Sequence, residues 1–163
     1  MSMSEFGHRR CGGMGADKAD GYWNHDGWSS PVSPPQDLVE LTAGFPHPPQ
    51  LVEALGMATL NARVLRYLRS GHTHKCYLGF SYCRFGCEWI EGTSCITDGT
   101  WVWPEGLVHY VDVHRVPLPD EFLATMRRHL WRVPFWAGAR AASKQWDSTF
   151  WVEWSARRLN TNS

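Results

Sequence analysis

The sequence lacks the apolar runs that a membrane protein needs. None of its apolar stretches approaches the roughly 18 to 20 residues of a membrane span. The first residues, MSMSEFGHRRCGG, have no continuous apolar segment of the kind found in a secretion signal. We therefore expect a cytoplasmic protein that does not associate with a membrane.

Motifs of several enzyme classes are also missing. The sequence contains no phosphate-binding P-loop, no GxGxxG, no GxSxG, no HExxH and no zinc-deaminase pattern. The GGMG stretch at residues 12–15 is not followed by a strand and a helix, so it indicates a flexible terminus. These absences favour a non-catalytic protein without excluding an enzyme.

The chain also has no net charge, with 16 basic and 16 acidic side chains. General nucleic-acid-binding proteins depend on neutralising phosphates, so this balance disfavours such a role. The charge is unevenly spread, however. Residues 71–114 carry three more acidic than basic side chains, and residues 115–163 carry four more basic than acidic ones. A local basic face in the last third therefore stays open, and nucleic-acid binding is kept as an alternative.

Cysteines are few, odd in number and clustered. A secreted disulfide scaffold usually pairs all its thiols, so five cysteines fit a reducing compartment better. Four of them lie within twenty residues of one another: Cys76, Cys83, Cys87 and Cys95. This clustering indicates a metal site.

The length and composition predict one domain preceded by an arm. Residues 1–49 are rich in Gly and Pro, so we expect an extended, irregular arm whose aromatic side chains pack on another surface. Residues 50–163 are expected to form a single α+β domain. The chain is rich in tryptophan, with ten in 163 residues. These tryptophans serve either the core of this domain or contacts with a partner.

Periodicity predicts the elements of this domain. Apolar residues at three- and four-residue steps predict a helix over 50–69, which ends at Ser70 and Gly71. Short apolar pieces over 75–103, with an Asp98-Gly99 hairpin signal, predict strands around a cysteine knuckle. A helix is expected next, with Pro104 at its first position and an end before Pro117. The prediction is a small zinc-braced α+β domain, in which a β-hairpin region is preceded by one helix and followed by others.

The predicted metal ligands are Cys83, Cys87, His109 and His114. The two cysteines enclose Gly86 in a CxxxC knuckle that can direct both sulfurs to one point, and an HxxxxH pair can complete the site. The ligand types and their order resemble those of Cys2His2 zinc fingers over about a fifth of the chain. However, 21 residues separate Cys87 from His109, against about 12 in the common finger. We therefore expect an expanded variant, at residues 76–117 of the larger domain.

The two histidines are five residues apart, which places them about 140° apart on a continuous helix. The helix must therefore end or distort between them. Other ligand sets stay open: Cys95 or Cys76 could replace a ligand, and Cys76 could act with His72 and His74. The cysteines could instead be buried thiols, and the histidines ordinary core and surface residues.

Four protein ligands leave no open coordination position, so a structural Zn2+ is expected. A catalytic zinc needs an open position. Three of these ligands, with Glu105 or Asp112 as a general base, would make a small metal-dependent hydrolase.

The last third of the sequence predicts an interaction surface. A helix starting near Pro119 is expected to bury Phe122, Leu123, Met126 and Leu130 and to expose basic residues. A half-buried strand is expected from Trp146 to Trp154, with Trp151 facing outward. The predicted interaction residues are the outward aromatics and their basic neighbours: Arg127, Arg128, Trp131, Arg132 and Trp151.

These patterns together predict a non-catalytic, zinc-stabilised protein. It would bind another protein as a component or accessory subunit of a larger assembly. The alternatives are a small metal-dependent hydrolase and a nucleic-acid-binding zinc protein.

Overall fold

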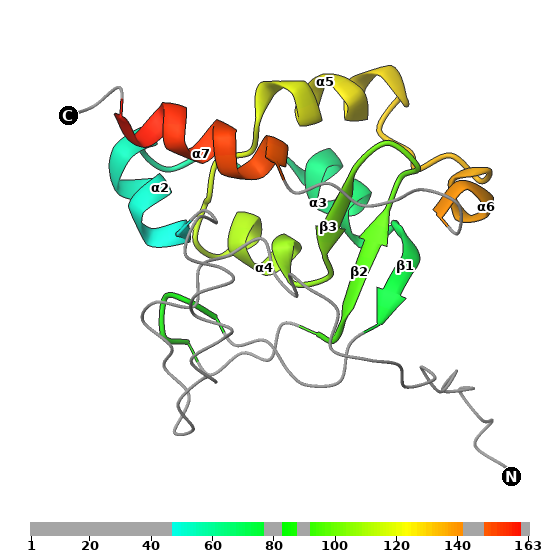
Figure 1. The fold of residues 1–163 in the computed structure, drawn as a ribbon, viewed down its shortest axis with the longest axis horizontal. Helices are drawn as coiled ribbons and strands as arrows, with labels where there is room; N and C mark the ends of the chain where they lie inside the picture. The colour runs from blue at the N-terminus through cyan, green and yellow to red at the C-terminus, as the bar shows by residue number, and fades with distance from the viewer. Residues whose placement is uncertain (1–46, 77–82, 88–91, 142–148, 161–163) are drawn as a thin grey trace, which may run out of the picture.

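A computed structural model describes residues 47–76, 83–87, 92–141 and 149–160. These residues form helices and a three-stranded antiparallel sheet, so the predicted α+β class is confirmed (Figure 1). Of the predicted arm, residues 1–49, only the last three are among the described residues. The division of the chain into this arm and one domain therefore stays a prediction. No helix in the described ranges is long and apolar enough to cross a bilayer.

The sheet has the order β1 (His72–Cys76), β2 (Ser94–Thr97) and β3 (Val102–Pro104). The predicted hairpin joins β2 to β3. The Asp98 carboxylate accepts hydrogen bonds from the backbone N–H groups of Thr100 at 2.8 Å and Trp101 at 2.6 Å. Gly99 has a φ of 83°, which a residue without Cβ adopts at low cost. Side chain and glycine thus both favour this turn.

The prediction of one helix over 50–69 is wrong at the centre of this range, because the chain forms two helices with a break between them. α2 (Pro48–Leu55) ends at Gly56, which has a φ of 75°. α3 (Ala62–Arg69) begins after Asn61, whose side chain accepts a hydrogen bond from the backbone N–H of Arg63 at 2.9 Å. A helix-ending glycine and a capping asparagine outweigh the continuous apolar pattern between them.

Two helices follow the sheet, as predicted: α4 (Leu107–Asp112) and α5 (Asp120–Arg128). Pro104 is not the first helical residue, because it ends β3 and α4 begins three residues later. α5 buries Phe122 and Met126 as expected. Leu130, which was expected on the buried face, is 79% exposed because α5 ends at Arg128.

The C-terminal region forms α6 (Ala137–Ala141) and α7 (Thr149–Asn160). The strand expected from Trp146 to Trp154 is therefore wrong over its described part. Trp151 and Trp154 lie three residues apart and share one face of α7, where they are 3% and 4% exposed. The expected outward position of Trp151 is wrong for the same reason.

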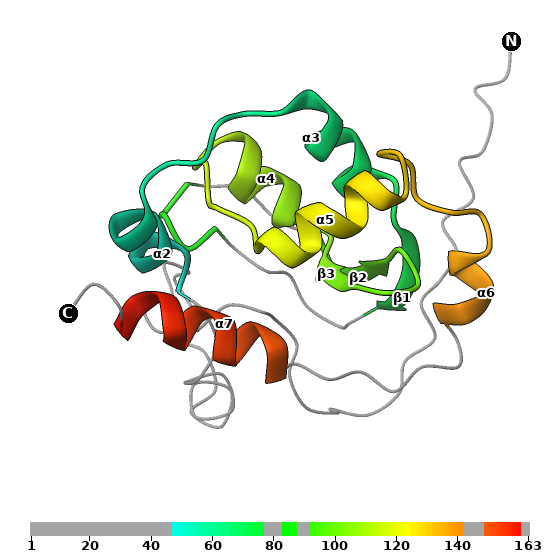
Figure 2. The same cartoon turned by 90° about the horizontal axis from the view of Figure 1, so that it is seen from above.

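The core lies between the sheet and the helices. Figure 2 shows α3, α4 and α5 next to one another beside the strands, with α7 beside α2. Trp103 of β3 is fully buried, and its indole N–H donates to the carbonyl of Leu68 at the end of α3 at 3.1 Å. The rings of Trp101 and Trp151 meet edge to face with centroids 5.9 Å apart. Three of the described tryptophans, Trp103, Trp151 and Trp154, are thus core residues.

Candidate metal centre

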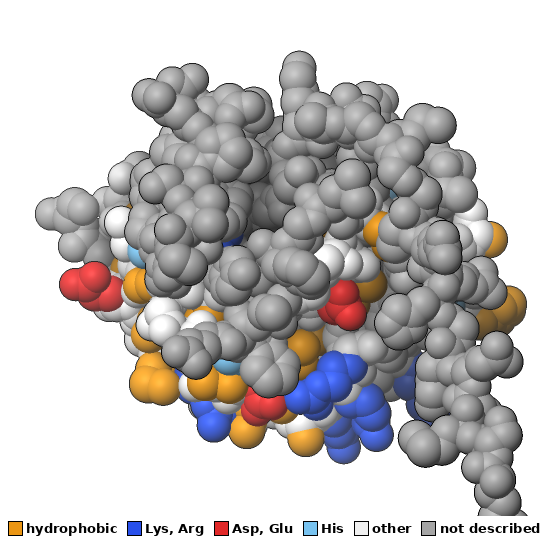
Figure 3. All heavy atoms as spheres, turned by 90° about the horizontal axis from the view of Figure 1, so that it is seen from below, with side chains coloured by type: hydrophobic (Ala, Val, Ile, Leu, Met, Phe, Trp, Pro, Cys, Tyr) orange, Lys and Arg blue, Asp and Glu red, His pale blue; other side chains and the backbone are white. Residues whose placement is uncertain are grey.

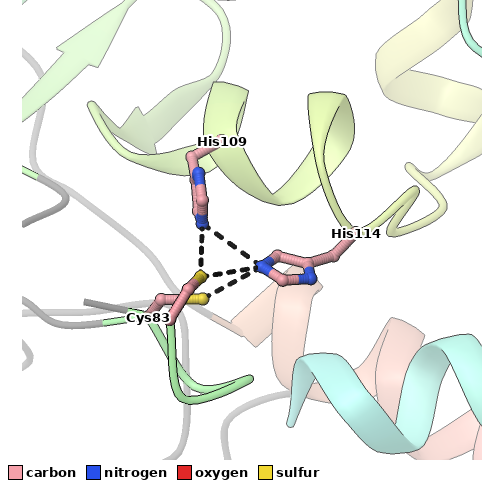
Figure 4. Close-up of side chains that lie close together, drawn as sticks. Cys83, His109 and His114 are labelled. Atoms are coloured by element: carbon pink, nitrogen blue, oxygen red, sulfur yellow. Dashed lines mark hydrogen bonds between the residues drawn. The ribbon is translucent and has the colours of Figure 1, made fainter. Parts of the chain in front are cut away.

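Four side chains converge beside α4: Cys83, Cys87, His109 and His114. Figure 4 shows Cys83, His109 and His114 pointing toward one another. One ligand atom from each lies within 4.8 Å of the other three. Within the described part of the chain, no other three or more cysteine, histidine or carboxylate side chains come this close together. The four are close enough to bind a metal ion, and they are the four residues selected from the sequence.

The two cysteines lie on a short knuckle, residues 83–87. The backbone N–H of Gly86 donates to the carbonyl of Cys83 at 3.1 Å, and the φ of Gly86 is 80°. The backbone N–H of Arg84 donates to the Tyr110 hydroxyl at 3.0 Å, which ties the knuckle to α4. The glycine closes the turn and Tyr110 fixes its position, so both thiols face the histidines.

The two histidines lie on either side of the end of α4. His109 is on the helix, and His114 follows its last residue, Asp112. Arg115 has a φ of 57°, so the chain leaves the helical path directly after His114. α4 ends at Asp112, which confirms that the helix ends between His109 and His114. The Phe85 ring stacks on the His114 ring with centroids 4.0 Å apart and planes within 3°, which fixes the imidazole.

The distances between donor atoms suit a tetrahedral ion. Cys83 Sγ lies 3.1 Å from His114 Nε2, and Cys87 Sγ lies 3.1 Å from His109 Nε2. The two Nε2 atoms are 3.2 Å apart. Zinc bond lengths of about 2.3 Å to sulfur and 2.0 Å to nitrogen imply tetrahedral edges of about 3.3 to 3.8 Å. The quoted contacts are thus a few tenths of an ångström shorter than the edges of such a tetrahedron, and all donor atoms lie within 4.8 Å of one another.

The electrostatics of the group favour uncharged imidazoles. Burial lowers the pKa of His109 below its ordinary value of 6.5, and His114 lowers it further while Asp112 opposes the shift. Burial also lowers the pKa of His114. A neutral imidazole keeps a lone pair for a metal, whereas a protonated one has none. Cys83 is fully buried, so a thiolate there needs a nearby cation.

The alternative ligands from the sequence do not join this group. Cys95 is buried in β2, and the Ser94 hydroxyl lies 3.6 Å from Cys76 Sγ. His72 Nε2 lies 3.2 Å from the carbonyl of Pro134, and His74 belongs to the same strand, β1. The structure therefore places all four of these residues on the sheet, outside the group beside α4.

The two carboxylates considered as general bases are also outside the group. The Asp112 carboxylate forms an ion pair with Arg69 of α3, with an N–O distance of 3.0 Å. Glu105 is exposed and lies against Gly92, where an added Cβ would meet its carboxylate. Asp112 is thus paired with Arg69, and Glu105 lies beside Gly92, so neither carboxylate belongs to the group of four.

The predicted interaction residues occupy two different environments. Arg127, Arg128 and Arg132 are exposed at the end of α5, and Trp131 is partly buried. Trp151 lies in the core. The sequence analysis did not select Leu130, Phe135 or Trp136 as interaction residues, although all three are exposed. Leu130 was expected to be buried because the predicted helix continued past Arg128. Pro134 directly precedes Phe135 and limits a helix to residues before it, but it does not account for an end at Arg128.

Comparison with other proteins gives no match: no family model, curated protein or solved structure resembles this chain significantly. Function must therefore be inferred from the site and the surface.

Proposed function

We propose that this protein is a non-catalytic interaction protein braced by one structural zinc ion. The observation that carries the proposal is the convergence of four nitrogen and sulfur ligands on one point. Two thiolates and two imidazoles suit zinc better than the hard cations, which prefer oxygen. Four protein ligands complete a tetrahedron, so no position is left for water or substrate.

The chain around the site explains why a brace would be useful. The knuckle of residues 83–87 contains no helix or strand. A hydrogen bond from the backbone N–H of Arg84 to the Tyr110 hydroxyl holds it against α4. A zinc ion would join this knuckle to α4 and to the segment that follows α4. In small metal-stabilised domains the binding free energy is folding free energy, about 10 to 16 kcal/mol for zinc-finger peptides. The ion would thus fix residues that secondary structure alone does not hold.

The exposed surface supports the interaction half of the proposal. The end of α5 presents three arginines next to exposed Leu130 and Phe135. Arginine and aromatic side chains are enriched where protein interfaces gain most of their binding energy. We infer that this surface binds a protein within a larger assembly.

X-ray absorption at the zinc edge tests the coordination directly. The proposal predicts two sulfur ligands at about 2.3 Å and two nitrogen ligands at about 2.0 Å. A spectrum with three protein ligands and one water oxygen would contradict a closed site and favour the hydrolase alternative.

A further inference from the structure

The residues that end α5 form an exposed surface of mixed apolar and basic character. Leu130 is 79% exposed, Phe135 is 90% exposed and Trp136 is 38% exposed. The Trp136 ring meets the His129 ring edge to face with centroids 6.1 Å apart, so this tryptophan lies against the end of the helix. We call this the α5-end surface and define it by six residues: Arg127, Arg128, Leu130, Arg132, Phe135 and Trp136.

The arginines of this surface carry charge that the described residues do not neutralise. Arg127, Arg128 and Arg132 are exposed, and within the described ranges no carboxylate lies at ion-pair distance from them. The Arg128 guanidinium donates to the Thr125 hydroxyl at 3.0 Å, which orients it without changing its charge. Three cationic groups within six residues therefore favour an acidic ligand.

The backbone of the α5-end surface is held in an uncommon conformation. Leu130 and Trp131 have φ values of 53° and 61°, which non-glycine residues adopt at a cost of about 1 kcal/mol or more each. Hydrogen bonds maintain this turn: the Trp131 N–H donates to the carbonyl of Met126 at 2.8 Å, and the Arg132 N–H donates to that of His129 at 3.1 Å. The strain and the bonds together present Leu130 to solvent in a fixed position.

A buried polar network holds His129, the residue before this turn, in place. The Tyr67 hydroxyl donates to the Asp98 carboxylate at 2.7 Å and lies 2.7 Å from His129 Nδ1. Since the single Tyr67 proton is engaged by Asp98, His129 Nδ1 must be the donor in the second contact. The surface is thus fixed before any ligand arrives, which lowers the entropic cost of binding.

We propose that the α5-end surface binds an acidic protein segment that carries apolar or aromatic side chains. This rests on the proposed function as an interaction protein. The arginines would pair with the segment's carboxylates, while Leu130, Phe135 and Trp136 would bury its apolar side chains. An exposed Leu offers nothing to a phosphate backbone, and the chain as a whole is neutral, so a protein segment fits this surface better than a nucleic acid.

A second basic region provides the control. Figure 3, seen from the side away from α5, shows Lys and Arg side chains gathered beside hydrophobic ones. Arg63 and Arg66 are exposed on α3, and Met57 and Leu60 are exposed in the segment that precedes this helix. That region has two exposed arginines, the number changed in the α5-end variant below, but no exposed aromatic side chain in the described residues. A ligand that recognises positive charge alone would lose affinity in the variants of both regions.

The test is a selection of random 12-residue displayed peptides on the full zinc-loaded chain. We expect the enriched peptides to be acidic and to contain apolar or aromatic residues. Their affinity, measured by fluorescence anisotropy, should fall about tenfold or more in Arg128→Glu/Arg132→Glu and in Phe135→Ala. It should change less than about twofold in Arg63→Glu/Arg66→Glu, the matched control. Zinc content and circular dichroism confirm that each variant is folded.

The other outcomes overturn the inference in distinguishable ways. Enriched peptides that are not acidic, or that bind the α5-end variants normally, would exclude this surface and leave the interaction function standing. If no peptide is enriched, a peptide ligand is rejected. The structural zinc ion is then still tested separately by the zinc content. A random 20-nucleotide RNA that binds the wild type, loses affinity in Arg128→Glu/Arg132→Glu and weakens steeply with salt would replace the protein segment with a nucleic acid.

Discussion

Replacing Tyr67 with Phe removes one hydroxyl from the centre of the buried network. Tyr67 and Asp98 are fully buried, and the side chain of His129 is 15% exposed. Burial raises the pKa of Tyr67 well above its ordinary value of 10.0, with Asp98 adding to the shift, so the hydroxyl keeps its proton and acts as a donor. Phe retains the ring, which stacks on Trp103 with centroids 6.1 Å apart. The substitution therefore removes hydrogen bonds and little packing.

The magnitude follows from the two bonds lost. A hydrogen bond to a charged group contributes about 1.5 to 3 kcal/mol, and a neutral one about 1 kcal/mol. We therefore expect Tyr67→Phe to lower the free energy of unfolding by about 2 to 4 kcal/mol. For a chain of this size each kcal/mol lowers the Tm by about 2 to 4 °C, so the expected fall is about 4 to 16 °C.

Urea unfolding followed by far-UV circular dichroism measures this change in the zinc-loaded protein. Tyr110→Phe is the matched control, because the Tyr110 hydroxyl accepts a neutral hydrogen bond from the backbone N–H of Arg84. Its expected cost is about 1 kcal/mol. Zinc content should be unchanged in Tyr67→Phe. A loss below about 0.5 kcal/mol in Tyr67→Phe, or one no larger than in the control, would refute the proposed network.

Three further predictions concern the metal site and the hairpin. His114→Ala should lower zinc affinity at least about 100-fold in competition with a chromophoric chelator, because it removes a ligand; an unchanged affinity would exclude His114 from the site. Gly99→Ala should lower the free energy of unfolding by about 1 to 3 kcal/mol in urea, because its Cβ would lie 2.7 Å from the Trp136 ring at a φ of 83°; an unchanged stability would contradict that contact. Acid should destabilise the protein. The pKa values of His109 and His114 are lowered in the folded state. Their contribution to the free energy of unfolding is therefore complete at a pH above 6.5, the ordinary pKa. It is lost as the pH falls through the lowered pKa values. A melting temperature that stays constant from pH 8 to pH 5 would contradict this.

The sequence predicted which four side chains lie close enough to bind a metal ion, because their positions depend on short segments. A CxxxC pair around Gly86 forms a tight turn, and the five-residue spacing of His109 and His114 requires a helix end. Neither inference needs knowledge of the tertiary fold. The contacts of Phe85 with His114 and of Tyr110 with Arg84 could not be predicted, because they depend on how the knuckle packs on α4.

The errors arise where two local patterns compete. The apolar periodicity over 50–69 continues through Gly56, although the glycine ends α2. Around Trp151 the tryptophans and polar residues alternate as in a strand, yet they also place Trp151 and Trp154 on one face of a helix. Tertiary packing against Trp101 and Phe122 favours the helix, and the sequence alone gives no measure of that packing.

The central claim is that Cys83, Cys87, His109 and His114 hold one zinc ion. Plasma mass spectrometry of protein purified without added metal tests it, with Cys83→Ser and His114→Ala measured in parallel. Cys95→Ser is the control, since Cys95 is a buried cysteine outside the group. We predict one zinc per chain in the wild type and in Cys95→Ser, and its loss from the other two variants. Wild-type protein without metal, or full zinc content in Cys83→Ser, would contradict the claim.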